Sequence, residues 1–263
     1  MISMPHMTRI IAPALLCLVV SCTKKDLSPT GTASLTVVNA MVGSGSLIPD
    51  FNKPGGRQSY YIDGPYANYG LFTNASMGGT NQISLSGTQQ MTVYDYPDTL
   101  PTSRPVLTLT LNLPIGSISS LFFTGTLTSP DTLLTVDHPP YYPVSDSVVG
   151  IRFVNLSPGS APISINIQGQ ANGSEAGSLS YKGITGFKSY PATSNISSYT
   201  FEFRDAASGT LLTNFVAAGI DSIGTDLYTS ANPWRYRNFT LALLGLPGGM
   251  NDSAQTVLLI GNY

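Results

Sequence analysis

The chain has 263 residues and is 42% hydrophobic, but only 10% of its residues are charged, compared with about 25% in a typical soluble domain. Its net charge is -2 and its 12 Lys and Arg residues form no cluster, which excludes the basic surface of a nucleic-acid-binding protein. The hydrophobic content and the low net charge also exclude an intrinsically disordered chain. We therefore expect a folded body whose polar positions are mostly uncharged.

The first 21 residues have the features of a secretory signal peptide. Arg9 supplies a positive charge, and residues 10–20 form an apolar run. A run of about 11 residues matches the apolar part of a signal peptide and is shorter than the ~20 residues that span a bilayer. The segment LVVSC, which ends in Cys22, resembles the lipobox of bacterial lipoproteins. That resemblance implies cleavage before Cys22 and lipidation of its thiol, and the alternative is an ordinary signal peptide with an incidental cysteine.

The expected lipidation also predicts where the body is held. Two or more acyl chains, palmitate among them, anchor a protein stably at a membrane, so the resemblance implies a lipoprotein of the bacterial outer membrane. Residues 22–32 then form the lipidated cysteine and a polar tether. The tether carries one acidic residue, Asp26, which leaves the periplasmic face and the cell surface open as alternatives.

Strict alternation of apolar and polar residues is the main signal of secondary structure in the body. It occurs in residues 107–113, 163–167 and 199–203. A period of two places one face of a strand in a core and the other in solvent, as in antiparallel sheets. Turn signals rich in Gly, Pro and Asp separate these runs, and no segment of the body has a convincing helical period. The sequence therefore predicts an all-β fold.

An internal repeat divides the body into two similar halves. Residues 37–44 recur as residues 153–160, with identical Val, Asn, Gly and Ser at matching positions, and later strands recur in the same order. The repeating unit has about 110 residues and about seven strands, close to the size of an immunoglobulin-like sandwich. We therefore predict two tandem immunoglobulin-like antiparallel β-sandwich domains, over residues 33–137 and 148–263, joined by a proline-rich linker at residues 138–147.

Each copy of the repeat opens with a strand that ends in Asn, at Asn39 and at Asn155. A short Asn side chain can bind the backbone where a strand enters a turn, so we expect a structural role, with ligand binding as the alternative. The opening strand, the motif RFVNLSP at residues 152–158 and a late strand ending in Gly resemble DUF4397, a domain family of unknown function in Bacteroidetes lipoproteins. The resemblance covers residues 33–263 as two copies, and it implies the fold and the location but no catalytic residues.

No recognisable catalytic or metal-binding set is present. Cys17 lies in the signal peptide and Cys22 is the expected lipid site, so the body has no cysteine for a disulfide, a zinc site or a nucleophile. His138 is the one histidine of the body and lies in the linker, and the only glutamates are Glu175 and Glu202, of which Glu202 is expected to face solvent. Neither a nucleotide-binding motif nor the spacing of a calcium loop occurs. The sequence predicts no enzyme, no cofactor and no metal.

Two sets of residues are candidates for surface functions. Exposed aromatic rings are common platforms for sugars and protein partners, with packing against strands as the alternative. The candidate ligand-contact aromatics are Tyr60, Tyr61, Trp234 and Tyr236. Asp followed by Ser or Thr and then an apolar residue resembles the O-glycosylation sequon of Bacteroidetes, with ordinary turn chemistry as the alternative. The candidate acceptors are Thr99, Thr132, Ser147, Ser222 and Ser253.

These features predict a lipid-anchored envelope protein that acts as a non-catalytic binding, adhesion or complex-accessory module. Its expected partners are the membrane, through the anchor, and a glycan or an envelope protein, but not nucleic acid. A purely structural spacer is the alternative, and a glycan-processing enzyme is the least favoured interpretation.

Overall fold

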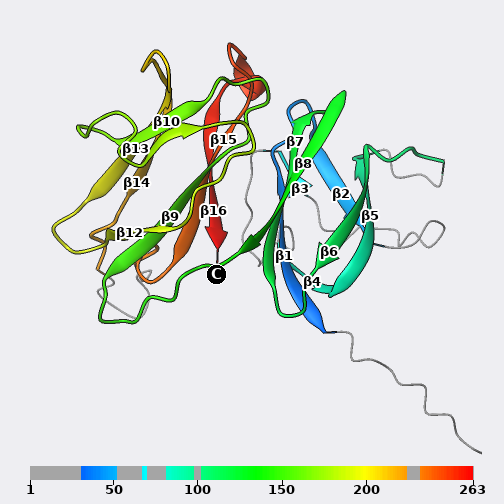
Figure 1. Cartoon of the computed structure of the whole chain (residues 1–263), viewed down its shortest axis with the longest axis horizontal. Coiled ribbons are helices and arrows are strands. Elements are labelled where there is room, and N and C mark those ends of the chain that lie inside the picture. The colour runs from blue at the N-terminus through cyan, green and yellow to red at the C-terminus, as the bar shows by residue number, and fades with distance from the viewer. Residues whose placement is uncertain (1–30, 52–66, 70–80, 98–101, 224–231, 263) are drawn as a thin grey trace, which may run out of the picture.

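Figure 1 shows the computed structural model of the chain, which describes residues 31–51, 67–69, 81–97, 102–223 and 232–262. These residues form sixteen β-strands and one short 3-10 turn, Asn251–Ser253, and the predicted all-β class is confirmed. Within these ranges no helix is long and apolar enough to cross a membrane.

The first half of the body contains two four-stranded sheets. One has the strand order β4-β1-β7-β8, and the other has the order β3-β2-β5-β6. The strands are β1 (Thr32–Asn39), β2 (Ser46–Asp50), β3 (Ala67–Asn68), β4 (Asn81–Leu85), β5 (Gly87–Asp95), β6 (Leu107–Leu113), β7 (Ile118–Thr126) and β8 (Ser129–Asp137).

The second half repeats this arrangement, with the sheets β12-β9-β15-β16 and β11-β10-β13-β14. Its strands are β9 (Val148–Asn155), β10 (Ile163–Ile167), β11 (Ala176–Leu179), β12 (Lys188–Pro191), β13 (Ser198–Asp205), β14 (Leu211–Ala218), β15 (Asn238–Leu244) and β16 (Thr256–Asn262). Each half thus has eight described strands rather than about seven. The strand order is the same in both halves, so β1 corresponds to β9 and β7 to β15.

Most neighbouring strands are antiparallel, but one central pair in each half is parallel. β1 pairs with β7, and β9 pairs with β15, in parallel registers. Parallel neighbours need a long crossover connection, and the strands of the other sheet, together with the edge strand β4 or β12, provide it. The central strands β7 and β9 are buried on both faces, so their polar side chains, such as Ser120 and Arg152, are buried together with their apolar neighbours.

The four sheets stack as two sandwiches that pack against each other, and the two sandwiches lie side by side in Figure 1. Each sandwich has its own apolar core. A third core lies between the sandwiches and contains Val38, Ala40, Phe122, Val154, Leu156, Ala242, Leu244, Leu258 and Ile260. Because side chains alternate along β7, Phe123 enters the core of the first sandwich while Phe122 faces the second sandwich.

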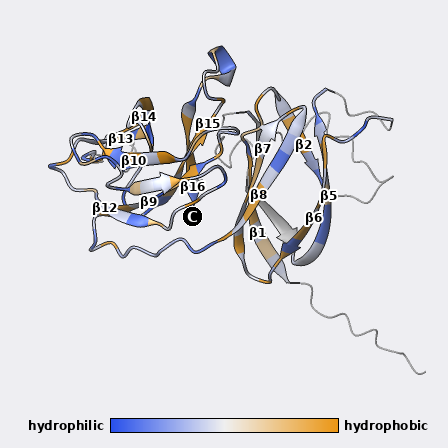
Figure 2. Cartoon of the chain, turned by 45° about the horizontal axis from the view of Figure 1, so that its top comes forward, coloured by the Kyte–Doolittle hydropathy of each residue, from blue (hydrophilic) through white to orange (hydrophobic). Residues whose placement is uncertain are grey.

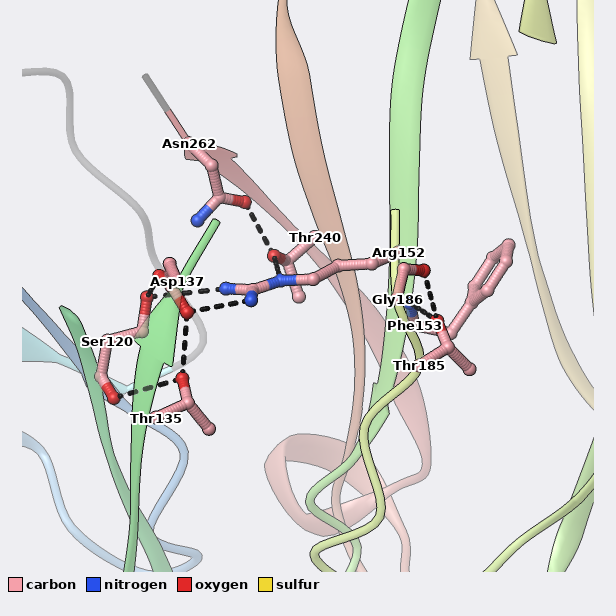
Figure 3. A network of polar contacts seen from close by, with 9 residues as sticks. All are labelled: Ser120, Thr135, Asp137, Arg152, Phe153, Thr185, Gly186, Thr240 and Asn262. Carbon is pink, nitrogen blue, oxygen red and sulfur yellow. Dashed lines mark hydrogen bonds and ion pairs between the residues drawn. The ribbon is translucent and has the colours of Figure 1, made fainter. Parts of the chain in front are cut away.

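A buried polar network accompanies this third core (Figure 3). Arg152 on β9 donates from Nη1 to Oδ1 of Asp137 on β8 across 2.7 Å, and their side chains are 5% and 1% exposed. Arg152 also donates to Thr240 at 2.8 Å, and Ser120 donates to Asp137. A buried charge pair is tolerated when its hydrogen bonds are satisfied, and breaking one partner is costly. The network therefore favours one register between the two sandwiches.

The strand-to-turn corner after β1 has the structural role that was predicted for Asn39. Its Oδ1 accepts the backbone N–H of Met41 at 3.0 Å, and its Nδ2 donates to Oγ of Ser44 at 3.0 Å. The Ser44 hydroxyl donates to the carbonyl oxygen of Met41 at 2.7 Å. Gly43 lies between these groups with a φ of 85°, a conformation that favours glycine.

The corner after β9 repeats the same contacts. Oδ1 of Asn155 accepts the backbone N–H of Ser157 at 3.1 Å, and its Nδ2 donates to Oγ of Ser160 at 3.0 Å. Gly159 has a φ of 74°. The repeated Asn and Gly-Ser positions therefore encode one local turn that is built twice.

Candidate functional site

The structure corrects the prediction for Trp234, which is not an exposed ligand platform. Its side chain is 6% exposed and belongs to the core of the second sandwich. Nε1 of Trp234 donates to the carbonyl oxygen of Ala218 at 2.7 Å, and the ring lies 4.9 Å from the Phe239 ring. Oδ1 of Asn232 accepts the backbone N–H of both Trp234 and Arg235. This turn directs the indole inward, where its one polar group is satisfied.

Of the other candidate aromatics, Tyr236 is the one that lies among the described residues. Tyr236 is 37% exposed, with a φ of 63°, and its backbone N–H donates to the carbonyl oxygen of Val148 at 2.8 Å. Tyr60 and Tyr61 lie outside the described residues, as does the expected lipid site Cys22. Tyr236 is therefore the one predicted ring that the structure places at the surface among the described residues.

The candidate glycan acceptors are half-buried where they are described, and Thr99 lies outside the described residues. Thr132 lies within β8, Ser147 directly precedes β9, and Ser222 follows β14. The Ser253 hydroxyl donates to the carbonyl oxygen of Met250 at 2.9 Å, as the turn interpretation predicts for that position. Glycosylation of the five candidate acceptors stays a prediction.

Both glutamates are held in ion pairs. Glu202, which was expected to face solvent, is only 8% exposed because Asn166 and Arg204 cover it. Hydrogen bonds from Asn166 and Arg204 lower the pKa of Glu202. Burial acts to raise the pKa of Glu175, but hydrogen bonds from Lys188 and Tyr190 lower it below its ordinary value. Both groups are therefore anions near neutral pH rather than proton donors.

No group of three His, Cys, Asp or Glu side chains in the described part of the chain could hold a metal ion. His138 is exposed in the segment between β8 and β9.

A cleft at the junction of the two sandwiches is the strongest candidate for a binding site. Its volume is about 890 Å³. Residues 42–46, in the turn after β1, and Tyr69 line it from the first half, and residues 251–256, between β15 and β16, line it from the second. We call this feature the junction cleft. The turn after β1 and the hairpin between β15 and β16, which line it, lie at the upper end of the molecule in Figure 1, and the 3-10 turn is hydrophilic in Figure 2.

Both Asn corners support the walls of the junction cleft. Ser44, which Asn39 holds, is part of the first wall. The second wall is held indirectly, because Nε2 of Gln255 donates at 3.0 Å to Oγ of Ser157, in the turn that Asn155 closes. The two strand-to-turn corners, whose expected role is structural, therefore also shape the site.

The junction cleft offers hydroxyl, amide and main-chain groups with little charge. Among the described residues that line it, Asp252 is the one charged residue and Tyr69 is the one aromatic residue. The Tyr69 hydroxyl is buried and has no hydrogen-bond partner among the described residues, an arrangement that costs free energy until a partner is found. Burial and the nearby Asp252 raise the pKa of Tyr69, so its hydroxyl stays a neutral donor at physiological pH.

Sequence reasoning missed this cleft because its two walls are about 200 residues apart in the chain, and local periodicity carries no information on such pairs. Two sequence features lie close to the walls of the cleft. The repeated Asn corner adjoins the first wall, and the Gly-rich turn at residues 247–249 precedes the second. Comparison with known protein families and with curated proteins finds no match for this chain. The chemistry of the site must therefore be inferred from its residues.

Proposed function

We propose that this chain is a lipid-anchored, non-catalytic binding protein of the bacterial outer membrane, with the DUF4397-like repeat as its scaffold. In this proposal Cys22 carries the anchor and the junction cleft holds the ligand. The observation that carries the proposal is the composition of the cleft, whose described residues present uncharged hydrogen-bonding groups around one tyrosine and one acid.

The ligand class that fits these walls is a neutral, hydroxyl-rich molecule such as a segment of a glycan. Such molecules exchange many hydrogen bonds with hydroxyl, amide and main-chain groups, and they pack against an aromatic ring. A volume of about 890 Å³ lies within the usual range of small-ligand sites. A protein with this activity would serve adhesion or deliver a glycan to a neighbouring complex.

The test is a screen of neutral oligosaccharides, followed by calorimetric titration of the best ligand, with the mature chain carrying Cys22→Ala. We expect Tyr69→Ala to weaken binding by about tenfold or more, as for a central aromatic contact, and Asp252→Asn to have little effect on a neutral ligand. Tyr236→Ala is the control, because that exposed tyrosine lies away from the cleft. Binding that is insensitive to Tyr69→Ala would exclude this site.

A structural spacer is the second candidate function, and the third apolar core favours it. A spacer must keep a fixed shape, and the sheets of the two sandwiches share a buried apolar face with an internal ion pair. In a spacer, Tyr69→Ala leaves capture of the envelope partner unchanged. A substitution that loosens the contact between the sandwiches, such as Arg152→Ala, weakens that capture.

A further inference from the structure

Exposed hydrophobic side chains gather at one end of the molecule. In the described part of the chain, five large hydrophobic side chains are more than 60% exposed. They are Ile115 at 73%, Tyr141 at 87%, Val144 at 78%, Ile223 at 64% and Met250 at 79%. Single exposed residues are ordinary, whereas a group of them indicates an interaction surface. Four of these five lie at the end where β1 and β9 begin, as the next contacts show.

Backbone contacts place the four residues at this end. Ile115 lies in the turn between β6 and β7, and the next residue, Gly116, donates its N–H to the carbonyl oxygen of Thr32 at the start of β1. Tyr141 and Val144 lie in the segment between β8 and β9, along the lower edge of Figures 1 and 2. Ile223 follows Ser222 in the chain. The carbonyl oxygen of Ser222 accepts a hydrogen bond from Asn232, which lies two residues before Trp234.

The same end carries an amphipathic and a basic side chain. Tyr236 is 37% exposed, and its N–H binds Val148 at the start of β9. Arg237 beside it is exposed. Tyrosine is favoured at the boundary between water and lipid, where its ring is apolar and its hydroxyl is hydrated, and arginine binds lipid phosphates. We call Ile115, Tyr141, Val144, Ile223 and Tyr236 the basal surface.

We propose that the basal surface docks on the lipid bilayer that holds the anchor. This inference rests on the proposed function, because it takes Cys22 as the lipidated residue. Nine residues lie between Cys22 and Thr32, where β1 begins, so the ten steps along the chain reach at most about 35 Å when extended and about 17 Å as a flexible chain. The end of the body from which the tether runs is the end that carries the exposed apolar side chains.

Docking of this end sets the orientation of the junction cleft. The turn after β1 and the hairpin between β15 and β16 lie at the opposite end from the starts of β1 and β9. With the basal surface on lipid, the cleft opens away from the membrane. Met250, the fifth exposed hydrophobic residue, lies beside the cleft and provides a control on the far end.

The absence of cysteine from residues 23–263 allows a direct test. The mature chain with Cys22→Ala receives one new cysteine, Val144→Cys or Met250→Cys, labelled with a dye whose emission shifts to the blue in lipid. On vesicles of phosphatidylethanolamine and phosphatidylglycerol, we expect a blue shift from position 144 and none from position 250. In sedimentation with the same vesicles, Tyr141→Ser combined with Val144→Ser should lower the bound fraction by about tenfold, from the lost apolar burial, and Met250→Ser should leave it unchanged.

Two outcomes overturn the proposal. One is equal emission from both positions together with equal sedimentation of all variants. The other is a dimer in analytical ultracentrifugation that Tyr141→Ser dissociates, which would make the basal surface an interface between two copies. Because the protein tested carries no lipid, failure here leaves lipidation of Cys22 and ligand binding by the junction cleft to be judged by their own measurements.

Discussion

Asn155 organises a strand end with one side chain, and its loss should be costly. Its amide accepts a backbone N–H and donates to Ser160 and to the carbonyl oxygen of Leu179 while fully buried. We expect Asn155→Ala to lower the free energy of unfolding by about 1–3 kcal/mol, because buried partners lose their hydrogen bonds. Urea unfolding measures this change. Asn195→Ala, at a turn position that forms no part of either corner, is the control, and equal stability of both variants would contradict the assigned role.

Glu175 makes stability depend on pH in a defined direction. Burial acts to raise its pKa, but hydrogen bonds from Lys188 and Tyr190 hold it below the ordinary value of 4.5. The unfolded chain binds this proton more readily, so the contribution of Glu175 to stability is fully present above the ordinary pKa and is lost as the pH falls through the folded pKa. Glu175→Gln should therefore be less stable than the wild type at about pH 7, with a smaller difference at about pH 3. Urea unfolding at both pH values tests this, and a constant difference would refute it.

At the scale of the element, β7 supplies side chains to two different cores, because successive residues of the strand point to opposite faces. Phe122 is fully buried although it points away from the core of its own sandwich, because the second sandwich covers it. We expect Phe122→Ala to cost about 3–5 kcal/mol in thermal or urea unfolding, the range for a buried phenylalanine. Leu134→Ala on β8, where the side chain is 36% exposed, should cost much less. If the sandwiches did not pack together, Phe122→Ala would be nearly neutral.

At the scale of the whole molecule, lipid attachment through Cys22 predicts which phase of a detergent separation holds the protein. The wild type expressed in a bacterial host should enter the detergent phase of a Triton X-114 separation, because two or more acyl chains anchor it. Cys22→Ser should move the protein to the aqueous phase without changing the fold of the body. Protease treatment of intact and lysed cells then assigns the body to the cell surface or to the periplasm. A wild type found in the aqueous phase would refute the anchor.

The sequence by itself determined the features that depend on neighbouring residues. The period of two in residues 107–113 predicts a strand because successive side chains must point to opposite faces. The Asn and Gly-Ser positions of the repeat predict the two corners because their hydrogen bonds join residues at most five positions apart. The repeat of strands along the chain predicts that corresponding strands take the same places in the sheets of both halves, and the structure shows this arrangement.

Only the tertiary structure decided whether solvent or another layer of the protein covers each face of a strand. Alternation predicts that Glu202 points away from its own core, but it does not say whether water or another layer of the protein covers the side chain. Trp234 has the loop setting of an exposed ring, yet a hydrogen bond to Ala218 and the neighbouring Phe239 bury it. The parallel central pairs and the junction cleft also join segments far apart in the chain. Such contacts depend on how complete sheets pack, which no local pattern of residues specifies.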